Sequence, residues 1–154
     1  MKKLKIYLDT SVILMRDNST RGIVTSEFLK KVAQSNHSFI ISEVVDFEIK
    51  DTTETQKEEN INFLKKLNCQ TLPYSNESHN LAWTYIIEGV LTENHFDDLL
   101  HVAYATVYEC DMIVSWNRKH VAKQSKIQKI NACNIKNNYC AITIFTPAEF
   151  LIHF

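Results

Sequence analysis

Glycine is scarce in this chain of 154 residues, where it occurs only as Gly22 and Gly89. Average usage of about 7% predicts ~11 glycines at this length. The chain therefore lacks the glycine-rich loops that wrap phosphates with bare backbone, which excludes the P-loop and the G-x-G-x-x-G dinucleotide motif. Proline is also present only twice. This shortage of turn residues argues against a turn-dense β-sandwich or barrel and favours a helix-rich globular domain.

Cysteine pairs, targeting segments and membrane spans are missing as well. No two cysteines form a C-x-x-C pair, and their spacings match no zinc module; they are Cys69, Cys110, Cys133 and Cys140. Buried free thiols in a reducing cytosol are the simpler interpretation. No run approaches ~18 uncharged apolar residues, and Asp9 ends the first apolar segment too early for a signal peptide. We expect one cytoplasmic domain over residues 1–154, without membrane association.

Charge is balanced in total and uneven along the chain, with Lys+Arg 17 against Asp+Glu 18. Residues 41–60 are strongly acidic, whereas residues 115–140 contain no acid. The basic side chains of the second segment are Arg118, Lys119, Lys123, Lys126, Lys129 and Lys136. Such runs are usually solvated faces, and an acidic pocket beside a basic flank is the functional alternative.

Short apolar strands alternate with helical segments along the chain. Strands are expected at residues 3–9, 39–41, 71–72, 112–114 and 141–144. Helices are expected at 20–34, around 61–67 and in the segment that Gly89 ends. Another helix should run from an N-cap at Ser42 to about residue 50, and another should begin at Asp97 or Asp98. Pro147 opens a last helical turn. This alternation predicts a three-layer α/β/α fold with a central parallel sheet. In such sheets, the binding crevice lies beyond the carboxyl ends of the strands.

Polar oxygen-bearing side chains occur at these strand ends and nearby helix starts. Asp9 follows the first strand, Asn117 follows the strand at 112–114, and Asp98 opens a helix. Glu48 shares the apolar side of its helix, where an unpaired carboxylate is costly. Each has a structural alternative: helix capping for the aspartates and a basic partner for Glu48. Taken together, they resemble an oxygen-only site for Mg²⁺ or Mn²⁺.

Four segments in order, YLDTSVIL, ISEVVDFEI, DDLLHVAYAT and DMIVSWNRKH, resemble the motifs of PIN-domain ribonucleases, and in particular VapC-type toxins of bacterial toxin–antitoxin pairs. The closing ITIFTPAEFL resembles the last strand and turn of that group, so the likeness extends from Tyr7 to Leu151. It implies a PIN-like domain whose metal-bound acidic pocket cuts single-stranded RNA. It also implies inhibition by a cognate antitoxin protein, and a homodimer.

The resemblance implies roles for individual residues. The metal ligands are Asp9, Glu48 and Asp98, and Asn117 holds the place of a fourth acid found in many members. Expected substrate contacts come from the neighbouring polar and basic side chains Thr10, Ser11, Ser115, Arg118, Lys119 and Lys123. His101, one helical turn after Asp98, is expected to pack within its helix more readily than to join the pocket. Trp116 is expected to be a core residue rather than one that stacks on a base.

Two other functions remain open from the sequence. A non-catalytic PIN-like module that binds RNA or a protein is favoured by Asn117, because the amide removes one negative charge from the expected pocket. A phosphotransferase of haloacid-dehalogenase type would use Asp9 as a nucleophile. That motif requires a second aspartate two residues later, where this chain has Ser11.

Overall fold

The computed structural model describes residues 2–117 and 120–154. Within them lies a sheet of five parallel strands in the order β3-β2-β1-β4-β5. The strands are β1 (Lys5–Leu8), β2 (Ser38–Ser42), β3 (Gln70–Leu72), β4 (Met112–Val114) and β5 (Thr143–Phe145). The expected parallel α/β/α architecture is confirmed.

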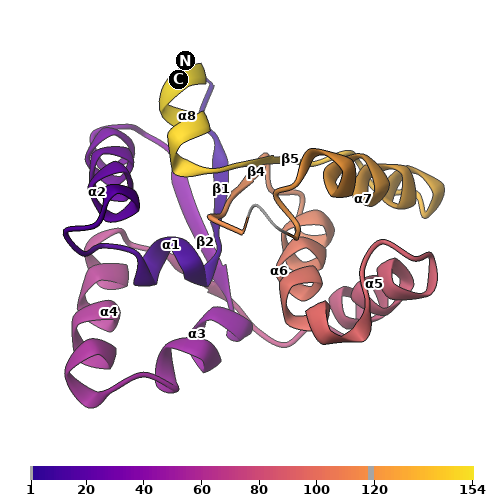
Figure 1. The fold of residues 1–154 in the computed structure, drawn as a ribbon, viewed down its shortest axis with the longest axis horizontal. Coiled ribbons are helices and arrows are strands. Elements are labelled where there is room, and N and C mark those ends of the chain that lie inside the picture. The colour runs from indigo at the N-terminus through magenta and orange to yellow at the C-terminus, as the bar shows by residue number, and fades with distance from the viewer. Residues whose placement is uncertain (1, 118–119) are drawn as a thin grey trace.

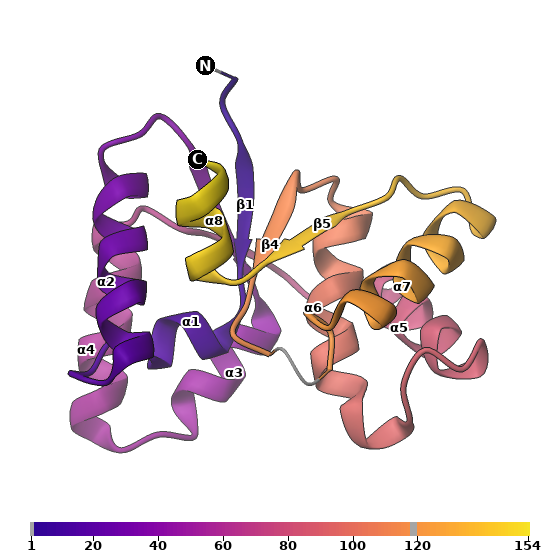
Figure 2. The same ribbon diagram turned by 45° about the horizontal axis from the view of Figure 1, so that its top comes forward.

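Helices cover both faces of the sheet (Figures 1 and 2). They are α1 (Thr10–Leu14), α2 (Thr20–Ala33), α3 (Glu43–Lys50), α4 (Glu54–Lys66), α5 (Asn76–Ile87), α6 (Phe96–Val107), α7 (Gln124–Lys136) and α8 (Pro147–His153), with a 3₁₀ turn, η1 (Glu93–His95). The pair α2 and α8 packs on one face, and α5 packs against α6 on the other (Figure 1). No described helix has both the length and the apolarity needed to cross a membrane.

The strands are buried because β4 and the inner residues of β1 and β2 are apolar. A strand covered on both faces needs this continuous pattern rather than alternation. Edge strands β3 and β5 have only three residues each, and Thr143 of β5 is exposed. The core therefore centres on β1, which pairs with β2 on one side and β4 on the other.

Strand order reverses beside β1, because the chain runs from β1 outward to β3 and then returns to the opposite side at β4. Such a switch point leaves a crevice at the carboxyl ends of the two strands. Here those ends are Leu8 and Val114, which are register partners. The residues that follow them, Asp9 and Ser115 to Asn117, consequently flank one crevice.

Helix boundaries agree with the sequence at several capping residues. Ser42 caps α3 by accepting a hydrogen bond from the backbone N–H of Val44, and Pro147 opens α8 behind the capping residue Thr146. The expected aspartate cap of α6 is wrong. A 3₁₀ turn leads into that helix, so its N-cap is His95 and both Asp97 and Asp98 lie in the first turn.

Cysteine positions only partly agree with the expected burial. All four cysteines are free thiols, with Cys110 and Cys133 buried, Cys69 half-buried and Cys140 exposed. Burial raises the pKa of the Cys110 thiol to about 12, and that of the Cys69 thiol similarly. These thiols are unreactive near neutral pH because the thiolate is the nucleophile.

Candidate active site at the carboxyl edge of the sheet

Asp9 divides its two carboxylate oxygens between structure and the crevice. Oδ2 accepts hydrogen bonds from the backbone N–H of Ser11 at 3.2 Å, from the Ser11 hydroxyl, and from the Ser115 hydroxyl at 3.0 Å. Oδ1 faces the imidazole of His101, whose Nε2 lies 3.4 Å away. Asp9 is thus the N-cap of α1, as the structural alternative predicts, and still presents one oxygen to the crevice.

Glu48 meets Asp9 through the same imidazole nitrogen. Oε1 of Glu48 lies 2.6 Å from Nε2 of His101 and also accepts a hydrogen bond from the Thr10 hydroxyl at 3.2 Å. The expected inward orientation of Glu48 on α3 agrees with these contacts. Its side chain keeps about a third of its surface accessible, so this carboxylate can be reached from solvent.

His101 is the residue that sequence reasoning places incorrectly. Instead of packing only within its helix, it is buried between the two acids, and its Nδ1 lies 2.7 Å from the Tyr7 hydroxyl. Tyr7 in turn lies 2.7 Å from the Ser42 hydroxyl. Burial raises the pKa of Tyr7 well above its usual value, so its hydroxyl stays protonated and can donate to Ser42.

The charge of His101 is set by competition between burial and the acids. Burial disfavours the imidazolium, but the negative charge of Asp9 and the hydrogen bond and charge of Glu48 together outweigh it, which raises the pKa of His101 above 6.5. Both ring N–H groups then have acceptors, one in Glu48 and one in the Tyr7 oxygen. Asp9 and Glu48 therefore favour the charged form of His101.

Asp98 reaches the crevice from the first turn of α6. Its pKa is raised mainly by burial, and the charge of Asp9 adds to that effect. A hydrogen bond from the Asn117 side chain and the nearby imidazoles of His101 and His120 oppose the shift only in part. Asp98, Asp9 and Asn117 therefore belong to one electrostatic neighbourhood, although they come from three separate elements.

Three predicted substrate contacts have internal partners. Ser115 is fully buried, and its hydroxyl donates to Asp9 and accepts from the Asn117 backbone N–H at 3.0 Å. Thr10 is buried against Glu48, and the Ser11 hydroxyl accepts from the Trp116 backbone N–H at 3.0 Å. The substrate contact expected of Ser115 needs correction, because its complete burial leaves it to position Asp9. Thr10 and Ser11 act mainly in the same way.

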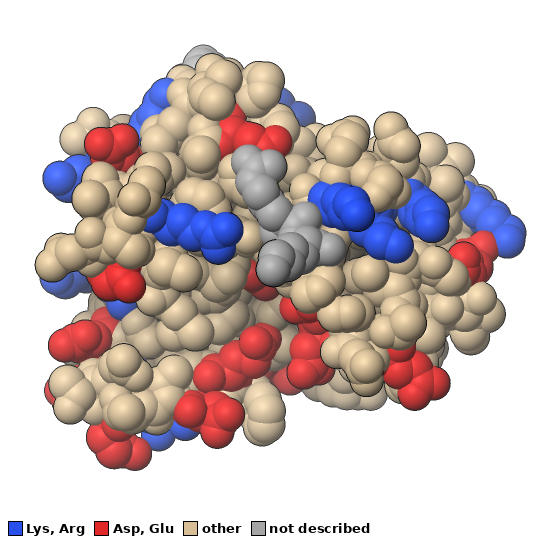
Figure 3. All heavy atoms as spheres, viewed as in Figure 1, with Lys and Arg blue, Asp and Glu red and all other residues tan. Residues whose placement is uncertain are grey.

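The basic flank is only partly described. Arg118 and Lys119 lie outside the described residues. Lys123 is exposed and is the N-cap residue of α7. Figure 3 shows basic side chains along α7 and acidic side chains gathered beside α3 and α6. Trp116 is a core residue, as expected, with its indole N–H donating to Thr25 Oγ1 at 2.7 Å.

The donor set fits a hard divalent cation. Asp9 and Glu48 share one imidazole nitrogen as a neighbour, and the charge of Asp9 acts on Asp98. Neighbouring carboxylates repel one another, and a cation relieves that repulsion. Within the described residues, the ligand atoms of these three acids do not all lie within 4.8 Å of one another. Their oxygens, with the amide of Asn117 beside Asp98, are the ligand type that Mg²⁺ and Mn²⁺ prefer.

Two solved complexes contain chains similar to this one. A chain of the crystal structure of VapBC2 from Rickettsia felis, bound to a DNA fragment from their promoter, has a TM-score of 0.61 and 15% identity, covering 93% of this chain and 98% of that one. DNA-bound VapBC from Salmonella typhimurium gives a TM-score of 0.55 and 14% identity, covering 94% and 98%. The chain has the fold of these VapBC proteins. At this identity the likeness establishes the fold, as the resemblance to VapC-type PIN domains implied. No protein-family model and no curated protein sequence matches the chain.

A pH series tests the state of His101. Its raised pKa means that the folded protein binds this proton more tightly than the unfolded chain, so the stabilisation is complete below about pH 6.5 and is lost as pH rises through the folded-state pKa. We expect the free energy of unfolding in urea, with chelator present, to fall as pH rises above about 6.5 in the parent. The fall should be absent in His101→Gln.

His153→Gln is the matched control, because His153 is exposed in α8, away from the pocket. This control should retain the parent's pH dependence. Equal slopes in the parent and His101→Gln would contradict a charged His101.

Proposed function

We propose that the protein is a metal-dependent endoribonuclease that cuts single-stranded RNA and is the toxin of a toxin–antitoxin pair. The observation that carries this proposal is the convergence of Asp9 and Glu48 on one nitrogen of His101 at the switch point of a sheet with the VapBC fold. Asp98 lies near enough for the charge of Asp9 to help raise its pKa. PIN-domain ribonucleases, which the motifs resemble, use acids in this order along the chain.

The pocket side chains have distinct tasks in this reaction. Asp9, Glu48 and Asp98 hold a Mg²⁺ or Mn²⁺ ion through carboxylate oxygens. When bound, such an ion offsets the negative charge that develops on the scissile phosphate and favours deprotonation of the attacking water. Asn117 orients Asp98 through its amide. With an amide in the fourth position, the pocket carries one negative charge fewer, so we propose a single ion before RNA arrives.

Positioning of the ligands comes from the hydroxyl groups around them. Ser11 and Ser115 hold Oδ2 of Asp9, while Thr10 holds Oε1 of Glu48. These bonds fix the carboxylates before an ion binds, which reduces the reorganisation that binding requires. His101 keeps the acids close together when no ion is present, because its imidazole N–H lies between them.

RNA binding is assigned to the basic side chains beside the pocket. Lys123 and Lys129 are exposed at the start and along the side of α7, and Arg118 and Lys119 precede them in the sequence. Lys126 is less available because its Nζ donates to the Val90 carbonyl at 3.0 Å. Phosphate contacts of this kind supply affinity without reading sequence.

Partner proteins are part of the proposal. A cognate antitoxin and a second copy of the chain both need apolar surface to cover. Large apolar side chains are exposed at Phe47 on α3, at Trp83 and Ile87 on α5, and at Ile152 on α8. Such side chains are typical of surfaces that a partner buries.

Removal of a pocket charge should abolish cleavage. Asp9→Asn and Asp98→Asn keep the side-chain shape and, at residue 9, a capping oxygen. We expect each to lower the rate of cleavage of a mixed RNA pool by at least about 100-fold, since ion-mediated charge stabilisation is worth several kcal/mol. Chelator should stop the parent, and Mg²⁺ or Mn²⁺ should restore it.

Asp46→Asn is the control for this experiment, because Asp46 is a half-exposed acid of α3 that pairs with Lys50 at 3.0 Å. It should cut at the parent rate. Parent-like cleavage by Asp9→Asn and Asp98→Asn would make the site assignment wrong. A parent that binds RNA without cutting it would favour the non-catalytic module instead.

Charge reversal on α7 should weaken RNA binding at low salt. In the double variant Lys123→Glu/Lys129→Glu, the slope of log K against log salt should become shallower by roughly 0.7 for each phosphate that the protein no longer neutralises. The same reversal at Lys30 and Lys31, both exposed on α2, is the control and should leave the slope near that of the parent. A slope unchanged by the α7 variant would mean that this face is only solvated.

Expression in a bacterial host tests the toxin role. The parent should arrest growth, and Asp9→Asn should not, because arrest depends on cleavage. Co-expression of the product of a small adjacent reading frame should restore growth. Arrest that persists in Asp9→Asn would point to the sequestering of a partner rather than to catalysis.

A further inference from the structure

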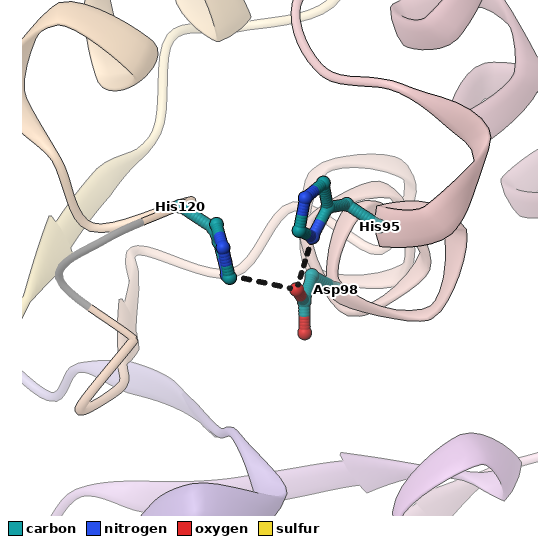
Figure 4. A group of neighbouring side chains, drawn as sticks. All are labelled: His95, Asp98 and His120. Atoms are coloured by element: carbon teal, nitrogen blue, oxygen red, sulfur yellow. Dashed lines mark ion pairs between the residues drawn. The ribbon is translucent and has the colours of Figure 1, made fainter.

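Three metal-binding side chains converge at the outer side of Asp98. His95 ends η1, Asp98 lies three residues later in α6, and His120 follows β4. Nδ1 of His95 and Nδ1 of His120 each lie 3.5 Å from the same oxygen, Oδ2 of Asp98. Figure 4 shows the two imidazoles directed at this carboxylate from opposite segments of the chain.

The spacing of these atoms matches the coordination shell of a small transition-metal ion. Ligand bonds of about 2.0–2.1 Å at a tetrahedral angle place two ligand atoms about 3.4 Å apart. Both His–Asp separations are 3.5 Å, and ligand atoms of all three residues lie within 4.8 Å of one another. The rings lie side by side, with centroids 3.9 Å apart. Two imidazoles on one tetrahedral ion lie farther apart than this, so one ring must turn outward to complete three legs of a tetrahedron.

We propose that His95, Asp98 and His120 form a second metal site, selective for a borderline transition-metal ion of the Zn²⁺ class. Two imidazoles and one carboxylate suit such an ion, whereas Mg²⁺ prefers oxygen alone. All three side chains are about one third exposed, so an ion can enter from solvent. A fourth position remains open to water or to an anionic group.

Asp98 belongs to both sites, and this gives the second site a regulatory consequence. An ion held by the two histidines engages Oδ2 of Asp98 and places a positive charge beside the oxygen-lined pocket. It therefore competes with Mg²⁺ or Mn²⁺ for this carboxylate and weakens their binding. This consequence rests on the proposed function, but binding at the histidines does not, since it requires neither Asp9 nor Glu48.

Co²⁺ and Zn²⁺ are the probes for this site. Co²⁺ added to the parent protein should give the intense visible absorption of a tetrahedral complex, and Zn²⁺ should displace it at one equivalent. His95→Gln and His120→Gln should each weaken Zn²⁺ binding in calorimetry by at least about tenfold. Loss of a residue that only supports a metal ligand already weakens binding about 10–100-fold. His153→Gln, a change at an exposed residue, is the control and should bind Zn²⁺ like the parent.

Histidine nitrogen resonances of the parent provide a measurement that needs no variant. Zn²⁺ should shift the signals of two imidazoles, and these should be the two absent from spectra of His95→Gln and His120→Gln. Zn²⁺ binding that is equal in all variants, or weak octahedral Co²⁺ absorption alone, would overturn the proposal.

Mn²⁺ titrations separate this proposal from the proposed function. Asp98→Asn should weaken both Mn²⁺ and Zn²⁺, whereas Glu48→Gln should weaken Mn²⁺ and leave the Zn²⁺ affinity near that of the parent. Loss of the Zn²⁺ site with intact Mn²⁺ binding would reject only the second site. A parent that binds Zn²⁺ at the histidines but neither binds Mn²⁺ nor cuts RNA would reject only the nuclease.

Discussion

One carboxylate oxygen, Oδ2 of Asp9, joins the segments on which the crevice depends. It caps α1 through Ser11 and holds the residue after β4 through Ser115, while the Asp9 backbone N–H donates to the Val114 carbonyl at 3.1 Å. Because these bonds occupy Oδ2, the orientation of Oδ1 toward the crevice is fixed by the fold. The capping role and the proposed metal-binding role are therefore compatible at this residue, since each uses a different oxygen of the same group.

Electrostatic repulsion at the sheet edge is the cost of this arrangement. Asp9 and Glu48 both face the buried imidazole of His101, while the charge of Asp9 acts on Asp98, where a hydrogen bond from Asn117 opposes it. Tyr7 contacts the imidazole of His101 and is itself held by Ser42. Strand β1 therefore positions both His101, through Tyr7, and Asp9, which directly follows the strand. A cation in the pocket would take over part of the same compensation, so the imidazolium and the ion relieve the same repulsion.

The parallel sheet could be predicted because each buried strand is a short apolar run between helical segments. The ligand set Asp9, Glu48 and Asp98 came from the resemblance to PIN-domain ribonucleases and stays a prediction. The contacts of His101 could not be predicted. Helical spacing places His101 on the buried side of its helix but does not show whether it contacts a backbone group or two acids. Helix α7 was missed because its buried side consists of few residues, Ile130, Cys133 and Asn134, and the cap of α6 was missed because η1 moves the helix start to Phe96. The His95–Asp98–His120 group joins residues that only the chain's return after β4 brings together.

Strand order also determines when the crevice comes into existence during synthesis. The central strand β1 leaves the ribosome first, but its neighbour β4, with register partners Ile6 and Met112, follows more than a hundred residues later. Pairings between such distant segments form late, because the entropy cost of closing the intervening chain into a loop comes before the contacts that stabilise the pair. For most of translation, Asp9 therefore has no contact with Ser115 or Asn117, which are synthesised later. The proposed active site is therefore incomplete until nearly all of the chain has been made, and a truncated product that ends before β4 lacks it.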